Sequence, residues 1–174
     1  MSTIAMIVAP IDYRDEEYEV PKNAFEKHAV TVKTLSKGGH EAHGMKGGIA
    51  KVDGAVGSFS SEVFDAVVFV GGGGAKIYFD DEQTFSIARE MVQKNKVVAA
   101  ICIAPSILAN AGILEGKRVT SFASEHDNLR NHGAEVVQDD VVVDGRIITA
   151  NGPSAAGTFA DEILKALGQS TVAA

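Results

Sequence analysis

The stretch Val97–Ser106, which reads VVAAICIAPS, decides the fold of this chain. Its first five residues are small or β-branched and apolar, a pattern typical of a strand buried on both faces of a parallel sheet. Pro105 suits the first turn of a helix, so the strand turns directly into a helix at Cys102. A residue at such a turn is held up into the crevice where open α/β sheets bind ligands. The stretch therefore predicts an α/β fold with Cys102 at a nucleophile elbow.

Cys102 is the only cysteine of the chain, and two interpretations of it are open. A free cysteine is often a small buried hydrophobe with no chemical role. A thiol just before a helix N-terminus instead meets unpaired N–H groups, which favour the thiolate and lower the thiol pKa. The position at the end of a core strand favours the reactive thiol, with a lowered pKa.

The other apolar segments alternate with segments of helical period, which indicates a mostly parallel sheet covered on both faces. Glycines break the pattern between Gly38 and Ser61, where we predict a small hairpin excursion. One domain over residues 1–174 is expected, with 168–174 as a C-terminal tail. Predicted strands cover residues 3–9, 30–35, 66–70, 97–101, 119–122, 141–144 and 147–150. Predicted helices cover 20–27, 80–95 (burying Phe85, Ala88, Met91 and Val92) and a final segment that Ser154 or Thr158 caps and Gly168 ends.

Composition excludes several functional classes. The chain has 174 residues with 23 acidic and 16 basic side chains, a formal net charge of -7, and no Lys/Arg run that could hold a nucleic-acid backbone. No apolar run approaches the ~20 residues that a membrane helix needs. The start of the chain shows no basic segment with a cleavage site, and one cysteine forms no internal disulfide. We therefore expect a cytoplasmic protein without nucleic-acid or membrane partners.

Four consecutive glycines, Gly71–Gly74, follow the predicted strand 66–70. Their N–H groups could cradle an anion, but Lys76 stands where a dinucleotide-binding motif needs its third glycine. The N–H groups of Gly72 and Ile103 could instead form an oxyanion hole beside Cys102. The alternative is a flexible turn between strand and helix, and the sequence alone favours neither.

An acidic loop, Asp12–Val20, follows the first strand. Loops at the carboxyl ends of neighbouring parallel strands converge, so one of its carboxylates could reach the Cys102 sulfur, although a loop carboxylate is by default solvated. The same charges repel a flavin phosphate. His40 and His43, with Glu41, are too few ligands for a metal site, so we expect neither metal nor cofactor.

Five motifs in this order resemble the ThiJ/PfpI superfamily, which includes the parkinsonism-associated deglycase, PfpI-type intracellular peptidases and isonitrile hydratases. They are Glu17–Glu19, Asp65–Gly72, Ala99–Pro105, Leu108–Lys117 and Val141–Gly145. The resemblance spans nearly the whole chain. It implies a flavodoxin-like α/β/α sandwich, usually assembled as a homodimer.

The resemblance also implies site residues. Cys102 matches the nucleophile at the elbow, and Glu19, the second acid of the Glu-aromatic-Glu pattern, matches the carboxylic acid that hydrogen-bonds to it. Gly72 and Ile103 match the backbone donors.

Two family histidines are missing. PfpI-type peptidases carry histidine directly after the cysteine, where this chain has Ile103, and the deglycase branch carries one where this chain has Phe122. His126, a few residues further on, is the remaining auxiliary candidate. Amide hydrolysis needs a proton for a poor leaving group, a task usually given to histidine.

The leading hypothesis is therefore a cysteine-dependent enzyme that acts on a small electrophile, by glyoxalase-, deglycase- or hydratase-like thiolate addition at Cys102 with Glu19 moving the proton. The alternatives are a PfpI-like peptidase or amidase and a non-catalytic cysteine-oxidation stress sensor.

Overall fold

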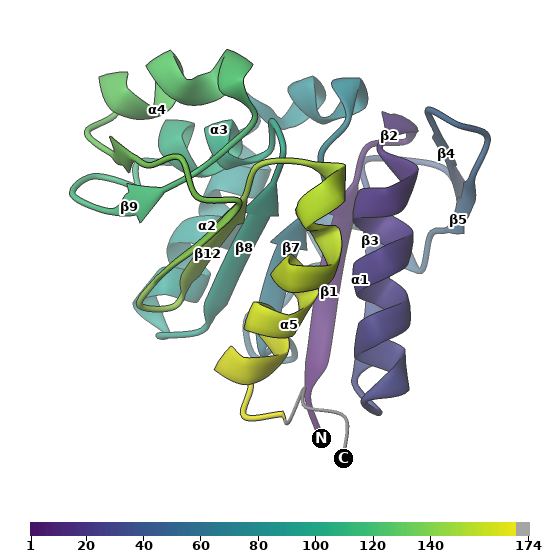
Figure 1. Cartoon of the computed structure of the whole chain (residues 1–174). Helices are drawn as coiled ribbons and strands as arrows, with labels where there is room; N and C mark the ends of the chain where they lie inside the picture. The colour runs from purple at the N-terminus through teal and green to yellow at the C-terminus, as the bar shows by residue number, and fades with distance from the viewer. Residues whose placement is uncertain (170–174) are drawn as a thin grey trace.

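The Val- and Ile-rich segments pair into one seven-stranded sheet in the computed structural model, which describes residues 1–169 (Figure 1). Its strand order is β11-β12-β8-β7-β1-β3-β6, and every pair is parallel except β11 with β12. These strands are β1 (Thr3–Val8), β3 (Thr31–Ser36), β6 (Gly54–Ala55), β7 (Ala66–Phe69), β8 (Val97–Ile101), β11 (Val141–Asp144) and β12 (Ile147–Ala150).

Two small sheets stand beside the main one. The first joins β2 (Ile11–Tyr13), β4 (Glu41–Gly44) and β5 (Ile49–Lys51), and β4 with β5 is the predicted hairpin excursion. The second pairs β9 (Arg118–Val119) with β10 (Glu135–Val136). The predicted strand 119–122 is therefore mostly wrong, because Ser121 and Phe122 lead into a 3-10 turn instead.

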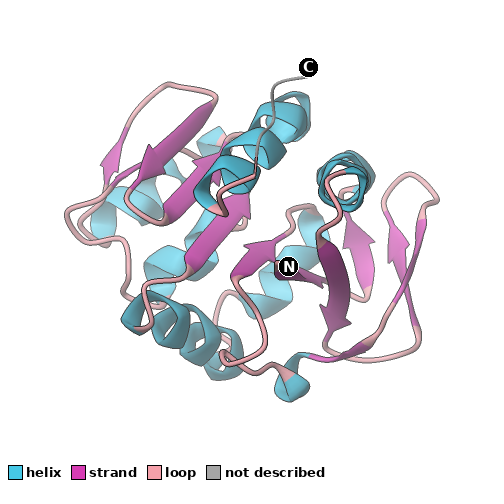
Figure 2. Ribbon diagram, turned by 90° about the horizontal axis from the view of Figure 1, so that it is seen from below, coloured by secondary structure: helices cyan, strands magenta, loops and turns pink. Residues whose placement is uncertain are grey.

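Helices cover both faces of the main sheet, as the view from below shows (Figure 2). Helices α1 (Asp15–Lys27) and α5 (Ala156–Ala166) share one apolar core with the sheet, while α2 (Glu82–Gln93) and α3 (Pro105–Asn110) share the other. Helix α4 (His126–Asn131) packs against α3. This is the predicted α/β/α sandwich. No helix within residues 1–169 is long and apolar enough to cross a membrane.

The cap of one helix and the buried face of another differ from the sequence predictions. Helix α5 has Ala155 at its N-cap and no side-chain cap, so neither Ser154 nor Thr158 caps it. Val92 of α2 is 40% exposed, and Ile87 is buried on that helix in addition to Phe85, Ala88 and Met91. The tail was expected at 168–174, of which residues 170–174 lie outside the described part of the chain.

Helix α1 begins five residues earlier than predicted, at Asp15 rather than Val20. Pro21 lies inside this helix, although proline usually occupies the first turn of a helix. The early start places the acidic residues Asp15, Glu16 and Glu17 in the first turn, where the positive end of the helix dipole stabilises them.

The three central strands β1, β7 and β8 are neighbours in the sheet and run parallel. Their carboxyl ends therefore meet at one edge, at the top of Figure 1. The segments that follow them are the loop into α1, the glycine run and Cys102. The fold thus brings the three chemically interesting segments of the sequence together.

Candidate active site

Cys102 adopts a left-handed backbone conformation, with φ of 65°. This conformation costs a residue with a Cβ roughly 1 kcal/mol or more, so the surroundings must hold it. The Cys102 N–H donates to the Ala150 carbonyl at 2.9 Å, and its own carbonyl accepts from the Phe122 N–H at 2.8 Å. The turn between β8 and α3 is therefore fixed on both sides, and the thiol is half-buried at the carboxyl edge of the sheet.

Glu17, rather than the expected Glu19, lies beside the Cys102 thiol. A Cβ built on Gly71 would stand 2.3 Å from Glu17 Oε1 and 2.7 Å from Cys102 Cβ, so both side chains crowd the same glycine. Glu17 is fully buried, and neither of its carboxyl oxygens has a well-formed hydrogen bond within the described residues. The acid beside Cys102 is therefore Glu17, and the expected assignment to Glu19 is wrong.

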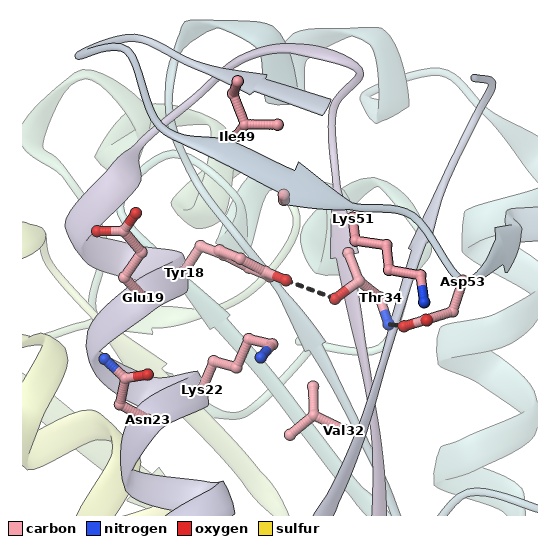
Figure 3. A pocket seen from close by; sticks show the side chains of 10 residues that line it. Tyr18, Glu19, Lys22, Asn23, Val32, Thr34, Ile49, Lys51 and Asp53 are labelled. Atoms are coloured by element: carbon pink, nitrogen blue, oxygen red, sulfur yellow. Dashed lines mark hydrogen bonds between the residues drawn. The ribbon is translucent and has the colours of Figure 1, made fainter. Parts of the chain in front are cut away.

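Glu19 points away from Cys102, because a step of two residues along a helix rotates the side-chain direction by more than half a turn. It is exposed and lines a separate pocket of about 450 Å³ between α1, β3 and the β4–β5 hairpin (Figure 3). In that pocket the hydroxyl groups of Tyr18 and Thr34 lie 2.6 Å apart in a hydrogen bond.

Burial governs the ionisation of the Glu17–Cys102 pair. It raises the pKa of Glu17 to about 7, against the smaller lowering effects of the Cys102 thiol and of the Arg14 charge. Burial, and next the negative charge of Glu17, raise the pKa of the Cys102 thiol to about 12. The thiol pKa is therefore raised, not lowered as the sequence predicted, because burial and the charge of Glu17 outweigh the N–H groups that favour the thiolate. Two such neighbours resist ionising together and behave as one unit that shares a proton.

The N–H groups of Gly72 and Ile103 face the sulfur and lower its pKa, which offsets part of the effect of burial. They come from the segments that follow the neighbouring strands β7 and β8. Negative charge on the sulfur, or on an atom bonded next to it, would lie close to these two donors.

The glycine run serves close packing. A Cβ on Gly72, where φ is 99°, would lie 2.4 Å from the Arg14 nitrogen, and one on Gly74 would lie 1.9 Å from the Ile11 carbonyl oxygen. The loop before α1 therefore rests directly on the glycines, and the Arg14 N–H donates to the Gly71 carbonyl at 2.9 Å. This contact sets the position of the first turn of α1, and with it Glu17. At Gly71, Gly72 and Gly74 the run is therefore a closely packed turn.

His126 lies at the start of α4, and its Nε2 is 3.2 Å from the Ser121 carbonyl oxygen. None of the groups that shift the Cys102 pKa is a histidine. Phe122, which stands where the deglycase branch carries its histidine, has its side chain 49% exposed. Among residues 1–169 no group of three or more metal-binding side chains could hold a metal ion.

Comparison with known proteins identifies the family of the chain. The model of the DJ-1/PfpI family matches residues 2–166, so the chain belongs to that family. It is 32% identical to a deglycase of Thermococcus kodakarensis over 93% of this chain and 98% of the relative. A Bacillus subtilis relative that carries a provisional cysteine-protease name is 30% identical over 96% of this chain and 99% of its own length.

A solved structure gives the same result for the fold. The crystal structure of a ThiJ/PfpI domain protein from Brachyspira murdochii superposes with a TM-score of 0.93 at 34% identity, covering 95% of this chain and 96% of that one. The flavodoxin-like architecture predicted from the sequence is thereby confirmed.

Replacing Gly71 by alanine tests the crowding at the site. We expect Gly71→Ala to cost about 1–3 kcal/mol of unfolding free energy, because its Cβ would overlap Glu17, Cys102 and the Ile101 carbonyl. Gly73→Ala is the matched control, since its Cβ would meet nothing within 4 Å. Chemical denaturation of both variants measures the difference. Equal stability of the two would contradict the packing described above.

The pH dependence of stability tests the burial of Glu17. Because its pKa rises from 4.5 to about 7 on folding, the folded state holds the proton more tightly and loses stability as pH rises between these values. The loss is about 3 kcal/mol on the scale of 1.4 kcal/mol per pKa unit. Glu17→Gln does not titrate, so its stability relative to the wild type should grow by this amount from about pH 4 to about pH 8. Urea denaturation at several pH values measures it, and a constant difference would refute the assignment.

Proposed function

We propose that this protein is a cysteine-dependent enzyme that acts on small electrophiles of the α-oxoaldehyde class or on their adducts with amines. Cys102 is the nucleophile and Glu17 carries the proton. The observation behind the proposal is the buried Glu17 carboxyl, which has no well-formed hydrogen bond within residues 1–169 and faces a thiol held by two N–H donors. The relatives named as deglycases support this class of reaction.

The reaction of methylglyoxal illustrates the role of each group. The Cys102 sulfur adds to the aldehyde carbon, and the thiol proton passes to the new oxygen, which gives a hemithioacetal. The N–H groups of Gly72 and Ile103 stabilise negative charge as it develops. Glu17 then takes the hydrogen of that carbon as a proton and returns it to the neighbouring carbonyl carbon. The hydroxyl proton of the hemithioacetal moves to the oxygen of that neighbouring carbon, which gives a thioester of lactate.

Water hydrolyses the thioester, and lactate and the free thiol are released. One carbon of the substrate is oxidised and the adjacent carbon is reduced, so the cycle needs no external oxidant or reductant. Glu17 suits this role because a pKa of about 7 lets it both give and accept a proton near neutral pH.

A peptidase or amidase role is less well supported by the site. Cleavage of an amide requires a proton donor for the amine, and the neighbour of Cys102 is a carboxyl group rather than an imidazole. The ring of His126 is directed to the Ser121 carbonyl. Addition to an aldehyde has no such leaving group, so Glu17 alone meets its proton requirements.

Three variants test the proposed reaction, with lactate formation from methylglyoxal as the measurement. Cys102→Ser should abolish turnover. Glu17→Gln should lower kcat by about 10²- to 10⁴-fold, the usual contribution of a general acid–base group. Glu19→Gln is the matched control on the same helix and should stay within about twofold of the wild type, because exposed side chains contribute little.

Two outcomes would overturn this assignment. Equal turnover in the wild type and Cys102→Ser would remove the nucleophile. A loss in Glu19→Gln that exceeds the loss in Glu17→Gln would return the proton carrier to the residue first inferred from the motif.

A second candidate function is a cysteine-oxidation sensor, and the same unpaired carboxyl favours it. Peroxide converts a thiolate to a sulfenate and then to a sulfinate, and a protonated Glu17 can donate a hydrogen bond to the sulfinate oxygen.

If the site senses oxidation, mild peroxide should add two oxygens at Cys102 and then stop. In Glu17→Gln the second addition should be slower by about tenfold, the worth of one hydrogen bond to a charged group. Intact-mass spectrometry over time measures both steps, with Glu19→Gln as the control. A thiol that resists peroxide, or equal rates in Glu17→Gln and the wild type, would exclude this function.

A further inference from the structure

Arg14 is the residue directly before α1, and its backbone rests on the glycine run beside the active site. The Arg14 N–H donates to the Gly71 carbonyl, and a Cβ added to Gly72 would stand 2.4 Å from the Arg14 backbone nitrogen. Gly72 supplies one of the two N–H groups that face the Cys102 sulfur. The Arg14 side chain therefore leaves the backbone next to the Glu17–Cys102 pair.

One edge of the Arg14 guanidinium is held by Glu16. Nε donates to both carboxyl oxygens of Glu16, at 3.1 and 3.2 Å, and Nη2 donates to Glu16 Oε2 at 2.9 Å. Within residues 1–169, Nη1 donates no hydrogen bond. A guanidinium carries five N–H donors, and its outer edge, formed by Nη1 and the second hydrogen of Nη2, can hold another planar anion. The side chain is 28% exposed, so part of it can be reached from solvent.

The neighbouring acids are already engaged. Asp15 accepts from the N–H groups of Lys46 and Gly48, and Glu16 is held by Arg14 and lies 3.6 Å from the Lys46 ammonium. The pKa of Arg14 is raised, first by its hydrogen bonds to Glu16 and, with smaller weight, by the charges of Glu17 and Cys102. The backbone contacts of Arg14 with Gly71 and Gly72 place this cation beside the Glu17–Cys102 pair, and the direction of its pKa shift agrees with that placement.

We propose that the outer edge of the Arg14 guanidinium binds a carboxylate on the electrophile, so that Cys102 reacts preferentially with substrates that carry this group. This inference rests on the proposed function, because it concerns the same thiol. It narrows the substrate class to carboxylate-bearing aldehydes and related electrophiles. Arg14 acts as a specificity-determining residue and takes no part in the proton transfers.

Two alkylating reagents that differ only in charge provide the test. Iodoacetate and iodoacetamide both react by the same step: the Cys102 sulfur forms a bond to carbon, iodide leaves, and the thiol proton goes to solvent. The ratio of their rates cancels any change in the reactivity of the thiol itself. Arg14→Gln should lower the iodoacetate-to-iodoacetamide ratio by about tenfold, the effect of losing a charge-assisted hydrogen bond.

Two further variants control the experiment. Glu16→Gln removes the carboxylate that competes for Arg14, and it should raise the ratio. Arg146→Gln removes an equal charge at the opposite end of the sheet, where Arg146 donates to the carbonyls of Asn95 and Ala166, and it should leave the ratio unchanged. Intact-mass spectrometry follows the single alkylation of Cys102.

Each outcome bears on a different claim. If both reagents alkylate Cys102 and the ratio is the same in Arg14→Gln and the wild type, the role of Arg14 is refuted while the proposed function stands. A fall of equal size in Arg146→Gln would trace the effect to net charge and would also refute it. If neither reagent alkylates Cys102, the proposed function fails, and the specificity inference fails with it.

Discussion

The burial of one carboxyl group against one thiol is the constraint on which the site depends. Placing Glu17 in the interior without a well-formed hydrogen bond is costly, and the fold tolerates it only because the group can keep its proton up to about neutral pH. Cys102 is subject to the same desolvation, and the negative charge of Glu17 raises the pKa of its thiol further, whereas the thiol lowers the pKa of Glu17 by a smaller amount than burial raises it. A pair of this kind holds a mobile proton beside a nucleophile, which is what additions to carbonyl compounds require.

Backbone packing sets this pair in place. The loop before α1 lies directly on the glycines after β7, and the strained turn after β8 is tied to β12 on one side and to the Phe122 N–H on the other. Three parallel neighbouring strands supply these segments, so their spacing follows from the sheet itself. The site is therefore as rigid as the core beneath it, which suits a constellation whose members must stay within contact distance.

The sequence predicts the strands better than the start of α1. Buried runs such as Val97–Ile101 are defined by composition alone, and the positions of Cys102 and the glycine run follow from strand ends. The choice between Glu17 and Glu19 depends on helical phase, whereas the expectation of Glu19 rests on its place in the Glu-aromatic-Glu motif. Extending the buried stripe of α1 backwards from Phe25 and Pro21 in steps of four reaches Glu17 and excludes Glu19. The raised thiol pKa could not be predicted, because it depends on burial and on which carboxylate is the neighbour.

The positive φ of Cys102 has a consequence for how this position can vary. Ala29 and Asn95 also have positive φ, but each follows the end of a helix, where such a conformation is common, whereas Cys102 follows a strand. Glycine would adopt the same turn without strain, so selection for stability alone would remove the side chain here. A cysteine at this position therefore lowers the stability of the fold relative to glycine. Under the proposed function, we expect glycine to replace it in relatives whose thiol has no chemical role.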